Sequence, residues 1–167
     1  AWTLLLAAGQ GNRLASATGG LAKQFLDWKG APLYWESTLV FSRCARVEGL
    51  VFVFPEACID EERERVAGLM RNASLGIPWK VVAGGALRQD SVRNGLSALP
   101  DDCMEVLIHD AARPFVSPVL VNRILDGLHG EASGECVAAC IPGIPVVDTI
   151  KVMDEEKKVV ANLIGNI

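Results

Sequence analysis

Leu4-Leu5-Leu6-Ala7-Ala8-Gly9-Gln10-Gly11-Asn12-Arg13 is the stretch that decides the fold of this chain. The apolar run predicts a buried strand over Trp2–Ala7, and the small residues after it predict a tight turn. Such a turn brings backbone N–H groups within reach of a phosphate. Arg13 and Lys23 follow and would supply the positive charge that a phosphate site needs. The alternative is a glycine turn with a purely structural role.

Apolar strands and helices alternate along the rest of the chain. Strands are expected at Trp2–Ala7, Leu50–Phe54, Trp79–Ala83, Glu105–His109 and Cys136–Ala139. Helices are expected at Leu33–Ala45, Asp60–Asn72 and Asp90–Leu99, and from Ser117-Pro118 to the residue before Gly130. In the helix Asp90–Leu99, the apolar face would consist of Val92, Leu96 and Leu99. The alternation predicts an α/β fold with a mainly parallel sheet flanked by helices.

Four clusters of glycine, charged and small residues follow the predicted strands. They are Ala7–Arg13, Gly84–Ser91, His109–Pro114 and Asp148–Lys151. Ligands of open α/β sheets bind beyond the carboxyl ends of the strands. The fourth cluster lies in the loops after the last predicted strand, and each of the others directly follows a strand. We therefore interpret the four clusters as one site.

The composition limits the classes of function. The 167 residues, half of them apolar, suffice for one domain with a substantial core. The net charge of −4 argues against nonspecific nucleic-acid binding, and no apolar run is long enough for a membrane span. No signal peptide is recognisable at the start. Five scattered cysteines and only two histidines argue against a zinc site and favour free thiols in a reducing cytoplasm.

The four clusters together resemble the cytidylyltransferases that act on sugar-alcohol phosphates, with His109–Pro114 as the most specific piece. The best match is the family of 2-C-methyl-D-erythritol 4-phosphate cytidylyltransferases of the non-mevalonate isoprenoid pathway, from Trp2 to about Leu163. The resemblance implies a Rossmann-like nucleotidyltransferase fold, with CTP and a polyol phosphate as substrates, pyrophosphate as a product, and magnesium (Mg2+) on the triphosphate. Three alternatives remain: a ribitol- or other polyol-phosphate cytidylyltransferase, a nucleotidyltransferase for another base, and a non-catalytic nucleotide-binding module.

The resemblance also implies roles for individual residues. Arg13 and Lys23 match the catalytic residues that stabilise the transition state. The nucleotide-binding residues would be Ala7, Ala8, Gly9, Gln10, Gly11, Gly84, Gly85, Ser91, Asp110 and Ala111. The acceptor-binding residues would be Asp110, Arg113 and Thr149, and the metal ligands are not identified. Two departures from the family concern the catalytic lysine: Ala22 replaces the usual proline before it, and the segment Ala15–Gly20 is longer than usual.

Structural roles remain open for several of these residues. Asp90 or Ser91 would serve equally well as the N-cap of the next helix. Asp110 and Arg113 would also form a plain ion pair, and Arg88 is expected to support its loop. His109 is expected to be a packed, hydrogen-bonded histidine rather than a base.

An extended arm is expected at residues 145–161 of a single nucleotidyltransferase domain spanning 1–167. Lys151–Ala161 has the pattern of a hairpin that turns at Asp154–Lys157. An isolated hairpin is marginal in water, so we expect its apolar face to dock on a second copy and form a homodimer with a shared acceptor site. The alternative is an arm that folds back on its own domain.

Relatives in this family carry an arginine just after the arm and a lysine near the C-terminus, and both position the acceptor. Neither can be assigned before the chain ends at Ile167, so a C-terminal part is expected to be missing. The expected location is the cytoplasm, or a plastid in a plant.

Overall fold

The computed structural model describes residues 1–9, 21–130, 134–145 and 150–164. It divides into two compact units, Ala1–Arg123 and Ile124–Ile167. Asp148 and Thr149 of the predicted fourth cluster lie outside the described residues, whereas Ile150 and Lys151 belong to the described part.

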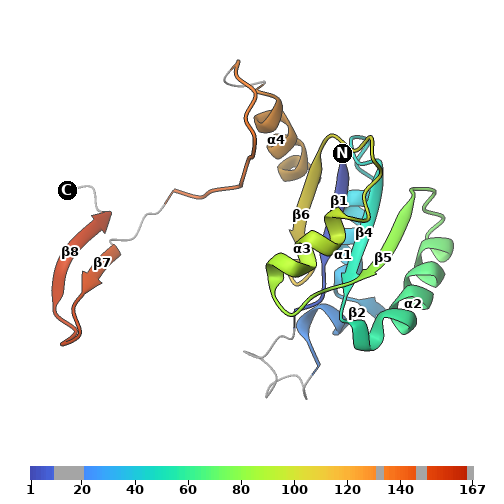
Figure 1. Cartoon of the computed structure of the whole chain (residues 1–167), viewed down its shortest axis with the longest axis horizontal. Coiled ribbons are helices and arrows are strands. Elements are labelled where there is room, and N and C mark those ends of the chain that lie inside the picture. The colour runs from blue at the N-terminus through green and yellow to red at the C-terminus, as the bar shows by residue number, and fades with distance from the viewer. Residues whose placement is uncertain (10–20, 131–133, 146–149, 165–167) are drawn as a thin grey trace. The chain divides into compact units, whose positions relative to one another are not determined.

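A four-stranded sheet forms the centre of the first unit (Figure 1). Its order is β5-β4-β1-β6, and all three neighbouring pairs are parallel. The strands are β1 (Trp2–Leu6), β4 (Gly49–Phe54), β5 (Trp79–Ala83) and β6 (Val106–Asp110). β4 is buried on both faces, with no exposed surface from Leu50 to Phe54, and β1 beside it is buried from Trp2 to Leu5, with Thr3 as its one polar residue. The predicted parallel α/β sheet is therefore confirmed.

Helices cover both faces of this sheet (Figure 1). They are α1 (Tyr34–Ser42), α2 (Ile59–Asn72) and α3 (Arg88–Leu96). A further helix, α4 (Pro118–His129), begins in the first unit and ends in the second. Successive residues of β4 point to opposite faces. Val51 and Val53 join the core cluster that includes Trp2 and Leu4, whereas Phe52 and Phe54 pack against the ring of Tyr34 at the start of α1.

Short elements connect the larger ones. They are the 3-10 helices η2 (Lys23–Phe25) and η3 (Glu56–Cys58) and the paired strands β2 (Asp27–Trp28) and β3 (Ala31–Pro32). The predicted cap of α4 is present, because Ser117 Oγ accepts a hydrogen bond from the Leu120 N–H at 3.1 Å. Gly130 follows α4 with φ 71°, a left-handed conformation that glycine adopts without steric cost.

Two sequence expectations are wrong in detail. Cys136–Ala139 is not a strand. The Val137 N–H donates to Leu128 O at 3.1 Å, and the Cys136 thiol donates to His129 O at 3.3 Å. The segment is therefore hydrogen-bonded to the end of α4 instead of to a neighbouring strand. In α3 the buried residues are Ser91 and Gly95, and Leu96 is exposed. A Cβ at Gly95 would lie 2.6 Å from Leu4 Cδ2, so the helix packs through its smallest residues.

The predicted hairpin of the arm is present in the second unit. β7 (Ile150–Met153) pairs antiparallel with β8 (Val159–Ile164). The turn is closed by Asp154, whose N–H donates to Lys158 O at 2.9 Å and whose carboxylate accepts the Lys158 N–H at 2.8 Å. Met153, Val159 and Val160 are each more than half exposed. Among the described residues, no helix has the length and apolar character needed to cross a membrane.

Candidate active site

The register of the sheet brings the carboxyl ends of its strands to one edge. Leu6 pairs with Val53 on one side and with Asp110 on the other, and Phe54 pairs with Ala83. Three hydrogen bonds extend the pairing past the strand ends: Ala7 N–H to Val53 O at 2.8 Å, Gly84 N–H to Phe54 O at 2.8 Å, and Ala111 N–H to Leu6 O at 3.0 Å. The three described clusters therefore begin side by side.

Gly84 is the point where the second cluster touches the first. A Cβ at this position would overlap the Ala8 Cβ and lie 2.8 Å from Ser91 Oγ. Only glycine lets the backbone after β5 approach Ala8 this closely. The Ala7–Gly9 turn and the Gly84–Leu87 loop are thus in direct van der Waals contact.

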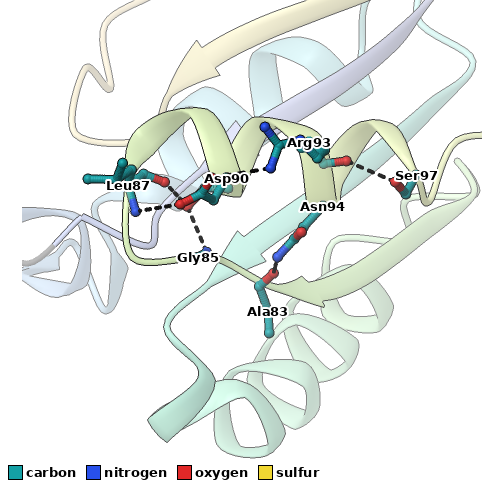
Figure 2. Close-up of polar contacts among 8 residues, drawn as sticks. Ala83, Gly85, Leu87, Asp90, Arg93, Asn94 and Ser97 are labelled. Carbon is teal, nitrogen blue, oxygen red and sulfur yellow. Dashed lines mark hydrogen bonds and ion pairs between the residues drawn. The ribbon is translucent and has the colours of Figure 1, made fainter.

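Side chains of α3 hold the Gly84–Leu87 loop in shape (Figure 2). Ser91 Oγ, which is buried, accepts the Gly85 N–H at 3.1 Å and donates to Leu87 O at 3.3 Å. The Asp90 carboxylate accepts the Leu87 N–H at 3.1 Å. Leu87 occupies the N-cap position, so neither Asp90 nor Ser91 is the N-cap residue. Both side chains instead fix the loop that holds the expected nucleotide-binding residues Gly84 and Gly85.

Asp110 lies between two arginines at the end of β6. Its Oδ1 accepts from Arg88 Nε at 3.2 Å and Nη2 at 2.9 Å, and its Oδ2 lies 3.4 Å from Arg113 Nε. Arg88 is the first residue of α3, so this contact ties the end of β6 to the loop after β5. All three side chains are more than a third exposed, so the ion pairs contribute little stability and mainly orient the carboxylate.

His109 is packed and hydrogen-bonded, as expected from the sequence. Its Nε2–H donates to Arg113 O at 2.9 Å, and its ring meets Phe41 edge-on, with 5.0 Å between centroids. Burial lowers the pKa of His109 below its ordinary value of 6.5, against opposing effects of the Arg113 carbonyl and Asp110. The imidazole is therefore held neutral and supports the loop after β6.

We expect this histidine to make stability depend on pH. Its folded pKa is depressed, so the unfolded chain takes up the proton first as the pH falls below about 6.5. The unfolding free energy should fall with pH in that window, at a rate of at most about 1.4 kcal/mol per pH unit, until the folded form is protonated too. Denaturant unfolding at several pH values should show a weaker slope in His109→Gln than in the wild type. Equal slopes would contradict this role.

Gln24 is a site residue that the sequence analysis missed. It is the middle residue of η2, it is buried, and its Nε2 donates to Ala7 O and to Gly9 O, both at 2.7 Å. Lys23, the expected catalytic lysine, precedes it and is exposed. The position of Gln24 beside Lys23 was its only signal in the sequence, because its partners lie 15 and 17 residues away.

The remaining predicted site residues are placed only in part. Ala111 is fully buried, and Arg113 is exposed. The predicted residues outside the described part of the chain are Gln10, Gly11, Arg13 and Thr149.

The described residues do not form a metal site of their own. Within these ranges, no group of three or more His, Cys, Asp or Glu side chains is placed to hold a metal ion. Asp110 is the carboxylate at the edge, and both of its oxygens face guanidinium groups.

Comparison with known proteins shows to which family this chain belongs. Residues 2–163 match the family model described as "IspD: 2-C-methyl-D-erythritol 4-phosphate cytidylyltransferase". The chain belongs to this cytidylyltransferase family. The resemblance seen in the sequence is thereby confirmed, and the match includes both the described edge and the arm.

Relatives in the cytidylyltransferase family are longer than this chain. The "Bifunctional enzyme IspD/IspF" of Oleidesulfovibrio alaskensis is 51% identical over 154 residues, which cover 92% of this chain and 37% of that protein. The "2-C-methyl-D-erythritol 4-phosphate cytidylyltransferase" of Clostridium botulinum (strain Loch Maree / Type A3) is 37% identical over 153 residues, which cover 92% of this chain and 61% of that protein. The chain thus spans about a third to three-fifths of the length of these relatives.

Solved structures show the same fold. The crystal structure of 4-diphosphocytidyl-2C-methyl-D-erythritol synthase from Anaerococcus prevotii superimposes with a TM-score of 0.70, covering 96% of this chain and 63% of that one. At 19% sequence identity this similarity speaks for the fold alone. It confirms the nucleotidyltransferase fold expected for the cytidylyltransferase family.

Proposed function

We propose that this protein transfers a cytidylyl group from CTP to 2-C-methyl-D-erythritol 4-phosphate and releases pyrophosphate. Family membership supports the reaction. The single observation that carries the proposal is the convergence of Ala7–Gly9, Gln24, the Gly84–Ser91 loop and Asp110 at one edge of the sheet. Ligands of such sheets bind at this edge.

The proposed chemistry needs positioned charge more than covalent help from the protein. A phosphate oxygen of the acceptor attacks the α-phosphorus of CTP, and the bond to the β-phosphate oxygen breaks as pyrophosphate leaves. Negative charge grows on the α-phosphate and on the leaving group, so fixed cations and N–H donors stabilise the transition state. We assign this role to Arg13, Lys23 and the backbone N–H groups of Ala8, Gly9, Gln10 and Gly11.

The other clusters would hold the rest of the two substrates. A Cβ at Gly84 would meet Ala8, and a Cβ at Gly85 would meet Asp90, so the two glycines let this loop pack closely while Ser91 holds it in shape. We assign the backbone of this loop to the base.

We assign the ribose side of the nucleotide to Asp110. Ala111 is fully buried and donates its N–H to Leu6 O, so it would support Asp110 from beneath rather than touch the nucleotide. Arg113 and Thr149, with Asp110, would bind the acceptor.

We propose that magnesium enters with the nucleotide. An ion held mainly by triphosphate oxygens needs few protein ligands. This agrees with Asp110, whose two carboxylate oxygens are already paired with Arg88 and Arg113. When bound, the ion would neutralise charge on the triphosphate.

We further propose a homodimer in the cytoplasm, joined through the 145–161 arm. The β7–β8 hairpin has exposed apolar side chains, and a two-stranded hairpin gains stability by burying them. The five cysteines are free thiols, in keeping with a reducing compartment. The molar mass of the full-length protein in solution tests the dimer.

Substrate choice tests the proposed reaction. We expect the full-length protein to use CTP at least about tenfold better than UTP, because a mismatched buried polar group costs more than about 1 kcal/mol. We also expect 2-C-methyl-D-erythritol 4-phosphate to be preferred over ribitol 5-phosphate. Pyrophosphate release measures both. Equal use of CTP and UTP would contradict the cytidylyl assignment, and nucleotide binding without turnover would favour a binding module.

A further inference from the structure

We propose that Gln24 is a positioning residue that fixes two parts of the catalytic machinery at once: the peptide groups of the Ala7–Gly9 turn and the place of Lys23. This inference rests on the proposed function of that turn in phosphate binding. It concerns a side chain that would not itself touch the reacting atoms.

The first observation is the double hydrogen bond of the Gln24 amide. A side-chain NH2 group has two hydrogens, and here Nε2 is 2.7 Å from both the Ala7 and the Gly9 carbonyl oxygens. Only 4% of the Gln24 surface is exposed, so water does not compete freely for these bonds. A buried amide that donates to residues i and i+2 of a turn fixes the turn at two points.

The second observation concerns the direction of the peptide groups. In a trans peptide, the C=O of one residue and the N–H of the next point in opposite directions. The Ala7 carbonyl points at Gln24, so the Ala8 N–H points away from Gln24. Carbonyl oxygens repel a phosphate and N–H groups attract it. By holding the carbonyls, Gln24 keeps the donor side of the turn available to an anion.

The third observation links the turn to Lys23. Lys23, Gln24 and Phe25 form the single turn of η2. The Phe25 ring packs against Tyr34 and Phe54, with centroids 6.3 and 6.0 Å apart. Because η2 is anchored in the core by Phe25 and to the nucleotide turn by Gln24, the exposed Lys23 is held at a defined distance from the turn.

This anchoring gives a physical reason why the chain tolerates its departures from the family before the lysine. Ala22 lacks the fixed φ of proline and leaves the approach to Lys23 less restricted. The Gln24 bonds restrict the same segment from its other side.

A double-mutant cycle with Lys23 tests the inference. Gln24→Met keeps the length of the side chain and removes both donors, and Glu64→Met is the control at an exposed residue of α2 outside the proposed site. In the full-length protein, Gln24→Met should lower kcat at least about tenfold, whereas Glu64→Met should not. In a Lys23→Ala background, the further loss caused by Gln24→Met should be smaller than in the wild-type background, because the part of its effect that acts through Lys23 is already lost.

If Gln24 had a merely structural role, Gln24→Met would cause the same fractional loss of kcat with Lys23 and with Ala at position 23, and that result would overturn the inference. An unchanged kcat in Gln24→Met would overturn it too. Circular dichroism checks that each variant folds. If Gln24→Met does not fold, Gln24→Asn replaces it, because this variant keeps the amide but is one methylene too short for both carbonyls.

The affinity for CTP, measured by calorimetry, separates this inference from the proposed reaction. If the wild type binds CTP without turnover, the reaction is refuted, and Gln24→Met should still bind CTP more weakly than Glu64→Met does. Equal CTP affinities of these two variants would overturn the inference whatever the reaction is.

Discussion

Replacing Lys23 by alanine is expected to lower turnover by roughly 10²-fold or more while changing the affinity for CTP much less. The lysine is exposed at the start of η2, next to the Gln24 amide that holds the Ala7–Gly9 turn. Its charge would be most valuable when negative charge builds up on the α-phosphate. Arg13→Ala should behave in the same way, because we assign it to the same transition state.

A lysine at the other end of the sheet provides the control. Lys80 is the second residue of β5, is exposed, and donates to Ala98 O at 2.7 Å. Lys80→Ala should keep kcat close to that of the wild type. Steady-state kinetics and calorimetric CTP binding measure the two effects separately. A Lys23→Ala variant that loses CTP affinity but keeps its turnover would contradict the catalytic role.

Gly84→Ala is expected to damage both the stability and the nucleotide affinity of the protein. The added Cβ would overlap that of Ala8 and press on Ser91 Oγ, so the two loops must move apart. Overpacking of this kind costs about 1–3 kcal/mol of unfolding free energy. The same displacement should weaken CTP binding by about tenfold or more, because it would move the loop that we assign to the base away from the turn that we assign to the triphosphate.

Gly76→Ala is the matched control for this substitution. A Cβ at Gly76 meets no atom within 4 Å, so the unfolding free energy should change by no more than about 0.5 kcal/mol. Denaturant unfolding and CTP titration of both variants give the comparison. Wild-type CTP affinity in Gly84→Ala would show that the contact between the loops does not matter for the site.

The strand Leu50–Phe54 was predicted within one residue of its bounds, because burial on both faces leaves a continuous apolar sequence. Trp79–Ala83 was also predicted with its observed bounds, although it is an edge strand with the exposed Lys80 in it. Cys136–Ala139 has a similar apolar composition, but its backbone bonds to the end of α4. Composition alone does not reveal which partner a short segment will pair with.

The site was predictable at the level of clusters but not of side-chain partners. Glycines and charges after strands mark the carboxyl edge whatever the details of the fold, and the Gly84 contact with Ala8 agrees with that expectation. The Gln24 bonds and the Arg88–Asp110 pair join residues 15 to 22 positions apart. These contacts depend on the register of the sheet and on how η2 packs, which no local pattern encodes.

A crystal structure of the full-length protein with CTP is the most direct test of the claim that these clusters form one nucleotide site. We expect the triphosphate to accept hydrogen bonds from the turn after β1, with Lys23 close to the α-phosphate. The cytosine should lie against the Gly84–Ser91 loop, and Gln24 should keep its bonds to Ala7 and Gly9. CTP bound away from the carboxyl edge of β5-β4-β1-β6, or a base that does not touch the Gly84–Ser91 loop, would contradict the claim.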